Sequence, residues 1–169
     1  MRFHRIRAAL NLITDATTNM IPAIARIWHE GWHQAHNAIA PESLTRLRTL
    51  PSFRTRTKTH LPNTRVAYSD ERFQGFCISA KDELYQLYVA PNAQGTGAGR
   101  ALIADCESRI ATAGYQTAWL ACAIGNTRAA RFYEKCGWQN VRTEPIDLET
   151  SEGPYTMEIW RFEKALTAD

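Results

Sequence analysis

The apolar residues of the chain recur with two different spacings, which predict helices and strands in alternation. Between about residues 16 and 33, Ile24, Ile27 and Trp28 recur every three to four positions and predict a helix with one buried face. Further helices are expected to begin at 41–44 and to cover about 98–110 and 128–135. Alternating or continuous apolar runs predict strands at residues 3–10, 65–68, 73–78, 83–90, 117–123, 138–142 and 155–162.

The order of these elements predicts how the strands pair. Very short turns separate the three strands between residues 65 and 90, which predicts an antiparallel meander. A helix connects the strands at 83–90 and 117–123, and such a crossover makes the two strands parallel. The basic stretch 51–63 lies between two prolines, and we expect a solvated loop there, with a binding surface for an acidic partner as the alternative. Residues 1–169 are thus predicted to form one α/β (α+β) domain with a mixed, mostly antiparallel sheet of about seven strands and about four helices.

Composition narrows the class of protein further. The formal net charge is only +3, so no strong attraction to nucleic acid is expected. No apolar run approaches the roughly 18 residues of a membrane span, and the basic start is not followed by the apolar core of a signal peptide. The four cysteines share no metal-binding spacing and are expected to be reduced thiols. We therefore expect a cytoplasmic protein with no membrane or nucleic-acid partner.

Three glycines lie where the strand at 83–90 gives way to the next helix. Gly95, Gly97 and Gly99 permit turns closed to other residues and let a ligand approach the backbone. The helix that they open carries free N–H groups and a positive dipole end, which favour a phosphate and especially a pyrophosphate. The spacing is not the GxGxxG of a dinucleotide fold, and Arg100-Ala101 stands where a nucleotide-hydrolysing loop needs Lys-Ser or Lys-Thr. A tight turn without a ligand is the alternative.

Two segments of the chain match the pattern of one known family. The segment 94–99 fits Gln/Arg-x-x-Gly-x-Gly/Ala, and the segment 126–138 fits Asn-x-x-Ala-x-x-x-Tyr-x-x-x-Gly-aromatic. Through these motifs and the order of its predicted elements, the chain resembles the GNAT superfamily of N-acetyltransferases. The resemblance is strongest over 83–138, and it implies that the parallel strands at 83–90 and 117–123 splay apart.

The resemblance implies acetyl-CoA as the co-substrate and no metal. Backbone N–H groups of 94–101 would hold its pyrophosphate, and its pantetheine arm would lie beside Leu87 and Val89, with the Leu87 N–H as an oxyanion donor. Asn126 would contact this arm, cap its own helix, or do both. The residues expected to bind the co-substrate are Leu87, Tyr88, Val89, Gln94, Gly95, Thr96, Gly97, Ala98, Gly99, Arg100, Ala101, Asn126 and Ala129.

Acetyl transfer requires a group that takes the proton of the amine and favours one that protonates the departing thiolate. The resemblance makes Tyr133 the candidate acid, mainly through a hydrogen bond to the sulfur because a phenol is the weaker acid; a core tyrosine is the alternative. Glu83 is the candidate base, since counting back from the loop places it where some histone-type family members carry a glutamate. It lies about 13 Å along the strand from Leu87 and would act through water, unless it is an ordinary exposed carboxylate. Tyr85 and Tyr88 are weaker candidates, of which one is expected to face the core.

Three histidines recur with helical spacing near the end of the first helix. His29, His33 and His36 would share one face, which is the arrangement of some metal sites, but Gly31 interrupts the helical segment and argues against one here. The resemblance places this segment beside the acceptor pocket. We therefore expect Trp32, His33 and His36 to bind substrate, with packing or surface roles as the alternative.

The expected function is direct transfer of an acetyl group from acetyl-CoA to a primary amine through a tetrahedral intermediate. The rival is a non-catalytic acyl-CoA-binding or regulatory module on the same fold. A small-molecule or peptide amine would be selected by residues 28–63 and 143–156, where the resemblance is thinnest. Dimerisation is common in the family, so a homodimer is an option.

Overall fold

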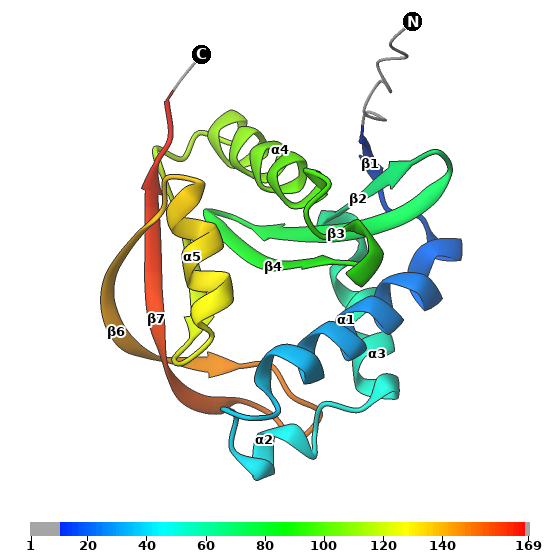
Figure 1. Cartoon of the computed structure of the whole chain (residues 1–169). Helices are drawn as coiled ribbons and strands as arrows, with labels where there is room; N and C mark the ends of the chain where they lie inside the picture. Colours follow the sequence, from blue (N-terminus) through cyan, green and yellow to red (C-terminus); the bar gives the residue numbers. More distant parts are fainter. Residues whose placement is uncertain (1–10, 168–169) are drawn as a thin grey trace, which may run out of the picture.

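The computed structural model describes residues 11–167, which form a seven-stranded sheet with helices on both faces (Figure 1). The strands are β1 (Leu12–Asp15), β2 (Thr64–Ser69), β3 (Arg72–Ala80), β4 (Glu83–Val89), β5 (Thr117–Ala123), β6 (Gln139–Leu148) and β7 (Tyr155–Ala165). The α-helices are α1 (Ile21–His36), α2 (Glu42–Thr45), α3 (Leu50–His60), α4 (Ala98–Thr112) and α5 (Thr127–Lys135). Short 3-10 helices are η1 (Thr18–Met20), η2 (Leu61–Asn63) and η3 (Pro91–Ala93).

The strand pairing confirms the predicted mixed sheet. Its order is β1-β2-β3-β4-β5-β7-β6, and β2, β3 and β4 form the antiparallel meander. The pair β4 and β5 is parallel, while each of the other neighbouring pairs is antiparallel. This arrangement follows from the connections, because α4 carries the chain across one face of the sheet between β4 and β5.

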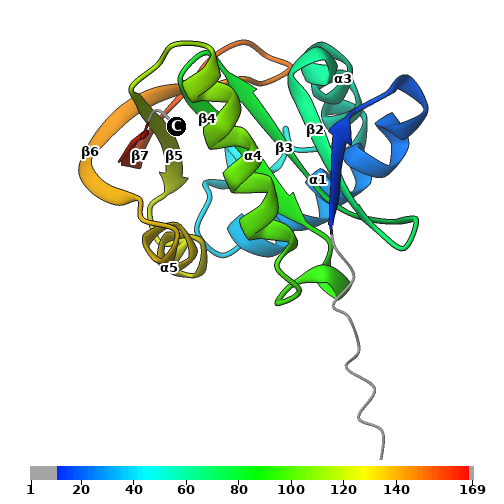
Figure 2. The same ribbon diagram turned by 90° about the horizontal axis from the view of Figure 1, so that it is seen from above.

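Two apolar clusters hold helices against opposite faces of the sheet. On one face, α4 buries Leu102 and Ile110 against the central strands, and on the other α1 and α3 bury Trp28 and Phe53. Figure 2 shows α4 crossing in front of β3 and β4, with α1 behind them. The four cysteines are free thiols, and three of them are buried in the core.

The expectation of a loop at 51–63 was wrong, because residues 50–60 form α3. Thr49 caps this helix by accepting a hydrogen bond from the Ser52 N–H, and Pro51 occupies the first turn, where proline needs no N–H partner. The buried side of α3 includes Phe53 but also Arg56. The helix therefore lacks the apolar stripe that would have marked it in the sequence.

Several other elements also begin or end at residues different from those expected. The strand expected at 3–10 lies outside the described residues, and β1 at Leu12–Asp15 pairs with β2 as the first strand of the sheet. The helix expected to start near residue 16 begins at Ile21, after η1. Strand β6 continues to Leu148, beyond the end expected at residue 142, and includes Pro145. Proline is tolerated there because β6 is an edge strand.

Candidate functional site

A pocket opens where β4 and β5 separate. Glu83 and Trp119 are the single registered pair between these strands within residues 11–167, so the strands splay as expected from there on. The pocket has a volume of about 1550 Å³, with walls from α1, β4, the glycine turn, β5, α5 and the β6–β7 region. This volume exceeds the roughly 300–1,000 Å³ of a typical small-ligand site and leaves room for two substrates. Of the expected site residues, all line the pocket except His33, Thr96, Ala98 and Ala101.

A bulge in β4 shapes the wall of the pocket. Ser79 on β3 pairs with Leu84, whereas the preceding Ile78 pairs with Gln86, so Tyr85 is the extra residue of β4. The bulge sends both Tyr85 and Tyr88 to the α1/α3 side of the sheet. The expectation that one of these two tyrosines faces the core and the other does not was therefore wrong, because both pack against the same apolar cluster. Burial raises the pKa of Tyr88 far above its ordinary value, which makes this phenol unsuited to act as a base at neutral pH.

The glycine turn leads directly into α4. Gly95 and Gly97 have φ angles of +78° and +92°, which favour glycine, and a Cβ built on either would meet no protein atom within 4 Å. Gly97 is the N-cap of α4 and offers no side chain to the first N–H groups of the helix. Gly99 allows close packing, since a Cβ there would lie 3.2 Å from the Phe132 ring and the ring would have to shift slightly. The turn thus leaves open space beside Gly95 and Gly97 at the start of α4, where the helix has no side-chain cap.

Helix α5 and its N-cap place three expected site residues on the opposite wall, namely Asn126, Ala129 and Tyr133. The Asn126 side chain caps this helix by accepting a hydrogen bond of 3.3 Å from the Ala129 N–H. One turn further on, Tyr133 packs against Trp138 and Phe162 and lines the pocket. Burial raises the pKa of Tyr133, so its hydroxyl keeps its proton at neutral pH and is available to donate a hydrogen bond.

Glu83 lies at the closed end of the splay. Burial and the nearby negative charge of Asp82 raise the pKa of Glu83 from 4.5 to about 7, while the positive charge of Arg161 opposes this rise. A carboxylate with such a pKa is half ionised near neutral pH and accepts a proton readily, which suits a general base. Cys122 of β5 also lines the pocket, but burial raises its pKa to about 12, so it remains a thiol and a poor nucleophile.

The histidines of α1 have local partners. Both ring nitrogens of His33 are engaged, with the Asn37 Oδ1 at 2.9 Å and the Arg48 carbonyl at 2.6 Å, and the residue lies outside the pocket wall. His36 stacks on Trp32, and both line the pocket. The described part of the chain, residues 11–167, contains no cluster of three ligands that could hold a metal ion.

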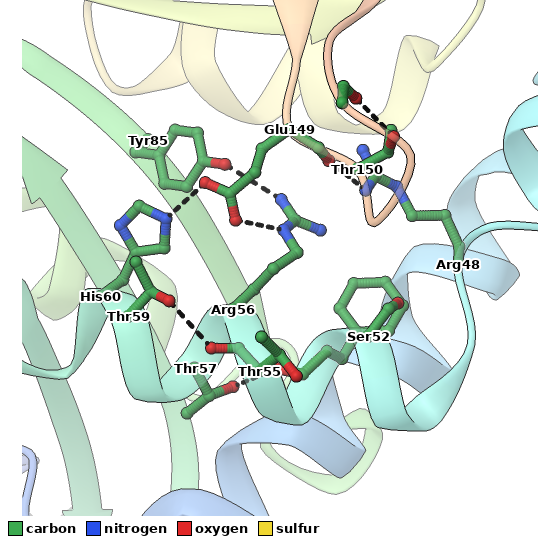
Figure 3. A network of polar contacts seen from close by, with 12 residues as sticks. Arg48, Ser52, Thr55, Arg56, Thr57, Thr59, His60, Tyr85, Glu149 and Thr150 are labelled. Carbon is green, nitrogen blue, oxygen red and sulfur yellow. Dashed lines mark hydrogen bonds and ion pairs between the residues drawn. The ribbon is translucent and has the colours of Figure 1, made fainter.

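A polar network that the sequence did not predict lies at the α3 end of the pocket. Arg48 and Arg56 are buried beside Tyr85, His60 and Glu149, with Glu149 reaching in from the β6–β7 loop (Figure 3). The signal available in the sequence was the spacing of Arg56 and His60 at i and i+4, which puts both on one side of a helix. Because a loop was expected at 51–63, this helical spacing did not indicate a shared face.

The chain matches the family model described as acetyltransferase (GNAT) family over residues 22–138. Among curated proteins, it is 31% identical over 130 residues to an uncharacterized N-acetyltransferase from Mycobacterium tuberculosis. This alignment covers 71% of this chain and 83% of that protein. Among residues 11–167, no helix combines the length and the apolar character that crossing a bilayer requires.

Solved structures share the fold at low sequence identity. A GCN5-related N-acetyltransferase from Rhodopseudomonas palustris aligns with a TM-score of 0.73 and 18% identity, over 94% of this chain and 98% of that chain. The PaiA N-acetyltransferase from Thermoplasma acidophilum, solved in complex with coenzyme A, aligns with a TM-score of 0.63 and 18% identity, over 92% of this chain and 99% of that chain. The ribosomal-protein-S18-alanine N-acetyltransferase from Escherichia coli aligns with a TM-score of 0.63 and 20% identity, over 95% of this chain and 96% of that chain.

Proposed function

The chain belongs to the acetyltransferase (GNAT) family, and on that premise we propose that it transfers an acetyl group from acetyl-CoA to a primary amine. The structural relative from Thermoplasma acidophilum was solved with coenzyme A, which supports this donor. The proposal extends to direct transfer, in which the amine attacks the thioester without a covalent enzyme intermediate. The raised pKa of the pocket cysteine Cys122, at about 12, favours direct transfer over a thiolate nucleophile.

The pocket fits the parts of acetyl-CoA. The open space beside Gly95 and Gly97 and the uncapped start of α4 suit a pyrophosphate, which accepts hydrogen bonds from several backbone N–H groups at once. The splayed edge of β4 beyond Glu83 offers backbone groups to an extended arm that carries amides. We assign the pyrophosphate to residues 94–101 and the arm to the strand at Leu87 and Val89.

Acetyl-CoA supplies a thioester carbonyl, which an amine can attack only after losing its proton. We assign that proton to the carboxylate of Glu83, either directly or through water. The Leu87 N–H would donate to the carbonyl oxygen as negative charge develops there. As the carbon–nitrogen bond forms and the carbon–sulfur bond breaks, the Tyr133 hydroxyl would donate to the departing sulfur.

One observation carries this proposal: a single pocket joins a carboxylate of pKa about 7, a protonated tyrosine and the glycine turn. Glu83 lies on β4 and Tyr133 on α5, so the two groups face the splay from different elements. A protein that only bound CoA would need the turn but neither of these two groups. Their presence together therefore favours catalysis over the binding-module alternative.

The test measures two quantities on the same sample. Calorimetry gives the affinity for acetyl-CoA, and a thiol reagent gives its amine-dependent conversion to CoA, across amino acids, polyamines, aminoglycosides and peptides. The proposal predicts binding together with thiol release for at least one class of amine. Tight binding with no amine-dependent release from any class would replace it with the binding-module function.

A further inference from the structure

Two arginine side chains are buried at the α3 end of the pocket. Arg48 is 3% exposed and Arg56 is 6% exposed, and both line the pocket wall. The Arg56 guanidinium lies over the Trp28 ring at 4.3 Å, and that of Arg48 lies 5.8 Å from the centre of the Trp32 ring. Aromatic faces orient a guanidinium, but they do not replace the hydrogen bonds that it makes in water. These two side chains are therefore fixed in position while part of their bonding capacity is unused.

The hydrogen bonds around the two arginines are incomplete. Arg48 donates from Nη1 to the Glu149 carbonyl at 2.6 Å, and Arg56 donates from Nη2 to the Tyr85 hydroxyl at 3.1 Å (Figure 3). Among residues 11–167, Arg48 Nε and the Nε and Nη1 atoms of Arg56 have no hydrogen-bond partner, although Arg56 Nε lies 3.4 Å from the Glu149 carboxylate. Buried donors without partners are rare in native proteins and call for an explanation, such as a ligand, a water molecule or an ion that the site holds.

Positive charge also exceeds negative charge at this end of the pocket. The carboxylate of Glu149 lies 3.4 Å from Arg56 Nε, but it is 42% exposed and also contacts the His60 ring at 3.0 Å, while Arg48 reaches only the Glu149 backbone carbonyl. Burial and the neighbouring charge of Arg56 lower the pKa of Arg48 to about 10. Because a guanidinium stays protonated in proteins, this lowered pKa reflects a buried positive charge that its surroundings do not balance.

The arginine pair shares the pocket with the proposed reaction centre. Tyr85 accepts the Arg56 hydrogen bond, and Tyr85 lies on the same strand as Glu83 and Leu87, two residues from each. A molecule that holds an anionic group at the arginines and an amine near Glu83 would bridge two parts of this one pocket. A small molecule suits such a site, because both guanidinium groups are almost fully buried and line the pocket wall.

We propose that Arg48 and Arg56 bind the carboxylate of the acceptor, which is a small amino acid whose primary amine is acetylated. This inference rests on the proposed acetyltransferase function and specifies its substrate class. Arginine suits the task because its planar donors match the geometry of a carboxylate, and charge-assisted hydrogen bonds are the strongest of their kind. A carboxylate at this position also supplies the negative charge that two buried guanidinium groups require.

The decisive comparison uses pairs of acceptors that differ only in the carboxylate. Free amino acids of increasing length are assayed against their carboxamides by thiol release, and we expect kcat/KM to favour the carboxylate by about 100-fold or more. The Arg48→Met and Arg56→Met variants should reduce this preference below about tenfold by raising KM for the free acid alone. KM for acetyl-CoA should not change. Arg54→Met is the control, because Arg54 lies on α3, as Arg56 does, but its side chain is exposed.

Each outcome decides the proposal. Equal rates for acids and carboxamides, or acetylation of acidic peptides without acetylation of free amino acids, would overturn the substrate class while leaving the acetyltransferase function intact. If the arginine variants fail to fold, the acid-to-amide ratio of the wild-type protein still decides. Should no amine be acetylated, calorimetry with amino acids in the presence of CoA separates the two claims. Binding of the acid but not of the amide supports the carboxylate site, and equal or no binding overturns it.

Discussion

Replacing Glu83 with glutamine tests the proposed base directly. The substitution keeps the shape of the side chain and removes the group that titrates. Burial and repulsion from Asp82 raise the pKa of Glu83 from 4.5 to about 7, so the wild-type carboxyl changes its charge in the range where the enzyme is assayed. The variant has no such group at this position. Its activity and its stability should therefore each differ from wild type in a way that depends on pH.

The activity prediction concerns the acidic limb of the pH profile. If Glu83 must be ionised, kcat/KM of the wild-type protein falls about tenfold per pH unit below about pH 7. The Glu83→Gln variant should lose about 100-fold to 10,000-fold in rate, which is the range of general-base contributions, and should lose this limb as well. A variant that keeps the wild-type acidic limb would refute the assignment of Glu83 as base.

The same substitution should increase the stability of the protein, although it lowers its activity. The folded state raises the pKa of Glu83 above its unfolded value, so ionised Glu83 destabilises the fold, and this cost is absent below about pH 4.5 and complete above about pH 7. A rise from 4.5 to about 7 corresponds to about 3 kcal/mol. Urea denaturation should therefore find Glu83→Gln more stable than wild type by up to about this amount at alkaline pH, with most of the gain lost near pH 5. An equal difference at both pH values would contradict the raised pKa.

Two neighbouring charges provide matched controls. Asp82→Asn removes a repulsion that raises the pKa of Glu83, so the acidic limb should move to lower pH. Arg161→Met removes an attraction that lowers this pKa, so the limb should move to higher pH. Shifts in opposite directions would identify Glu83 as the titrating group, whereas two unmoved profiles would assign the limb to another residue.

Three further substitutions test other parts of the structure. Tyr133→Phe should lower kcat about tenfold or more without changing the affinity for acetyl-CoA, and an unchanged kcat would remove Tyr133 from the acid role. Gly97→Val should abolish CoA binding in calorimetry, because it places a branched side chain at φ +92° in the space assigned to the pyrophosphate. Gly114→Val, at φ +99° and equally open space but outside the pocket, should retain binding, and equal losses in both would point to strain alone. Phe53→Ala should cost about 3–5 kcal/mol in urea denaturation, since Phe53 is fully buried against Trp28, and a loss below about 1 kcal/mol would contradict the packing of α3.

The elements that surround the co-substrate pocket could be predicted from the sequence because local patterns determine them. Alternating or continuous apolar residues marked β2 to β5, and the glycines at 95–99 marked the start of α4. The helical connection between β4 and β5 required them to be parallel, which the structure confirms. These features depend on neighbours in the sequence or on a single crossover, so one chain is enough to reveal them.

The α3 end of the pocket, where we propose that the acceptor binds, could not be predicted, because it depends on contacts between residues far apart in the chain. Arg56 of α3 is buried because its guanidinium lies over the Trp28 ring of α1 and beside the Glu149 carboxylate of the β6–β7 loop. Neither partner is close in the sequence, so the sequence of α3 alone resembles a solvated basic loop. The bulge at Tyr85 depends on the register between β3 and β4, which apolar alternation does not encode. Both features arise where the chain departs from simple periodicity, which is typical of functional sites.

The most direct test of the account follows acetyl-CoA and an amino acid in a single reaction. Free thiol is measured with a colorimetric reagent while mass spectrometry follows the amino acid. The account predicts that thiol and N-acetylated amino acid appear in equal amounts, and that Glu83→Gln and Tyr133→Phe slow both equally. Thiol release that does not depend on the amine, or no release from a protein that binds acetyl-CoA tightly, would contradict the claim that this pocket catalyses acetyl transfer.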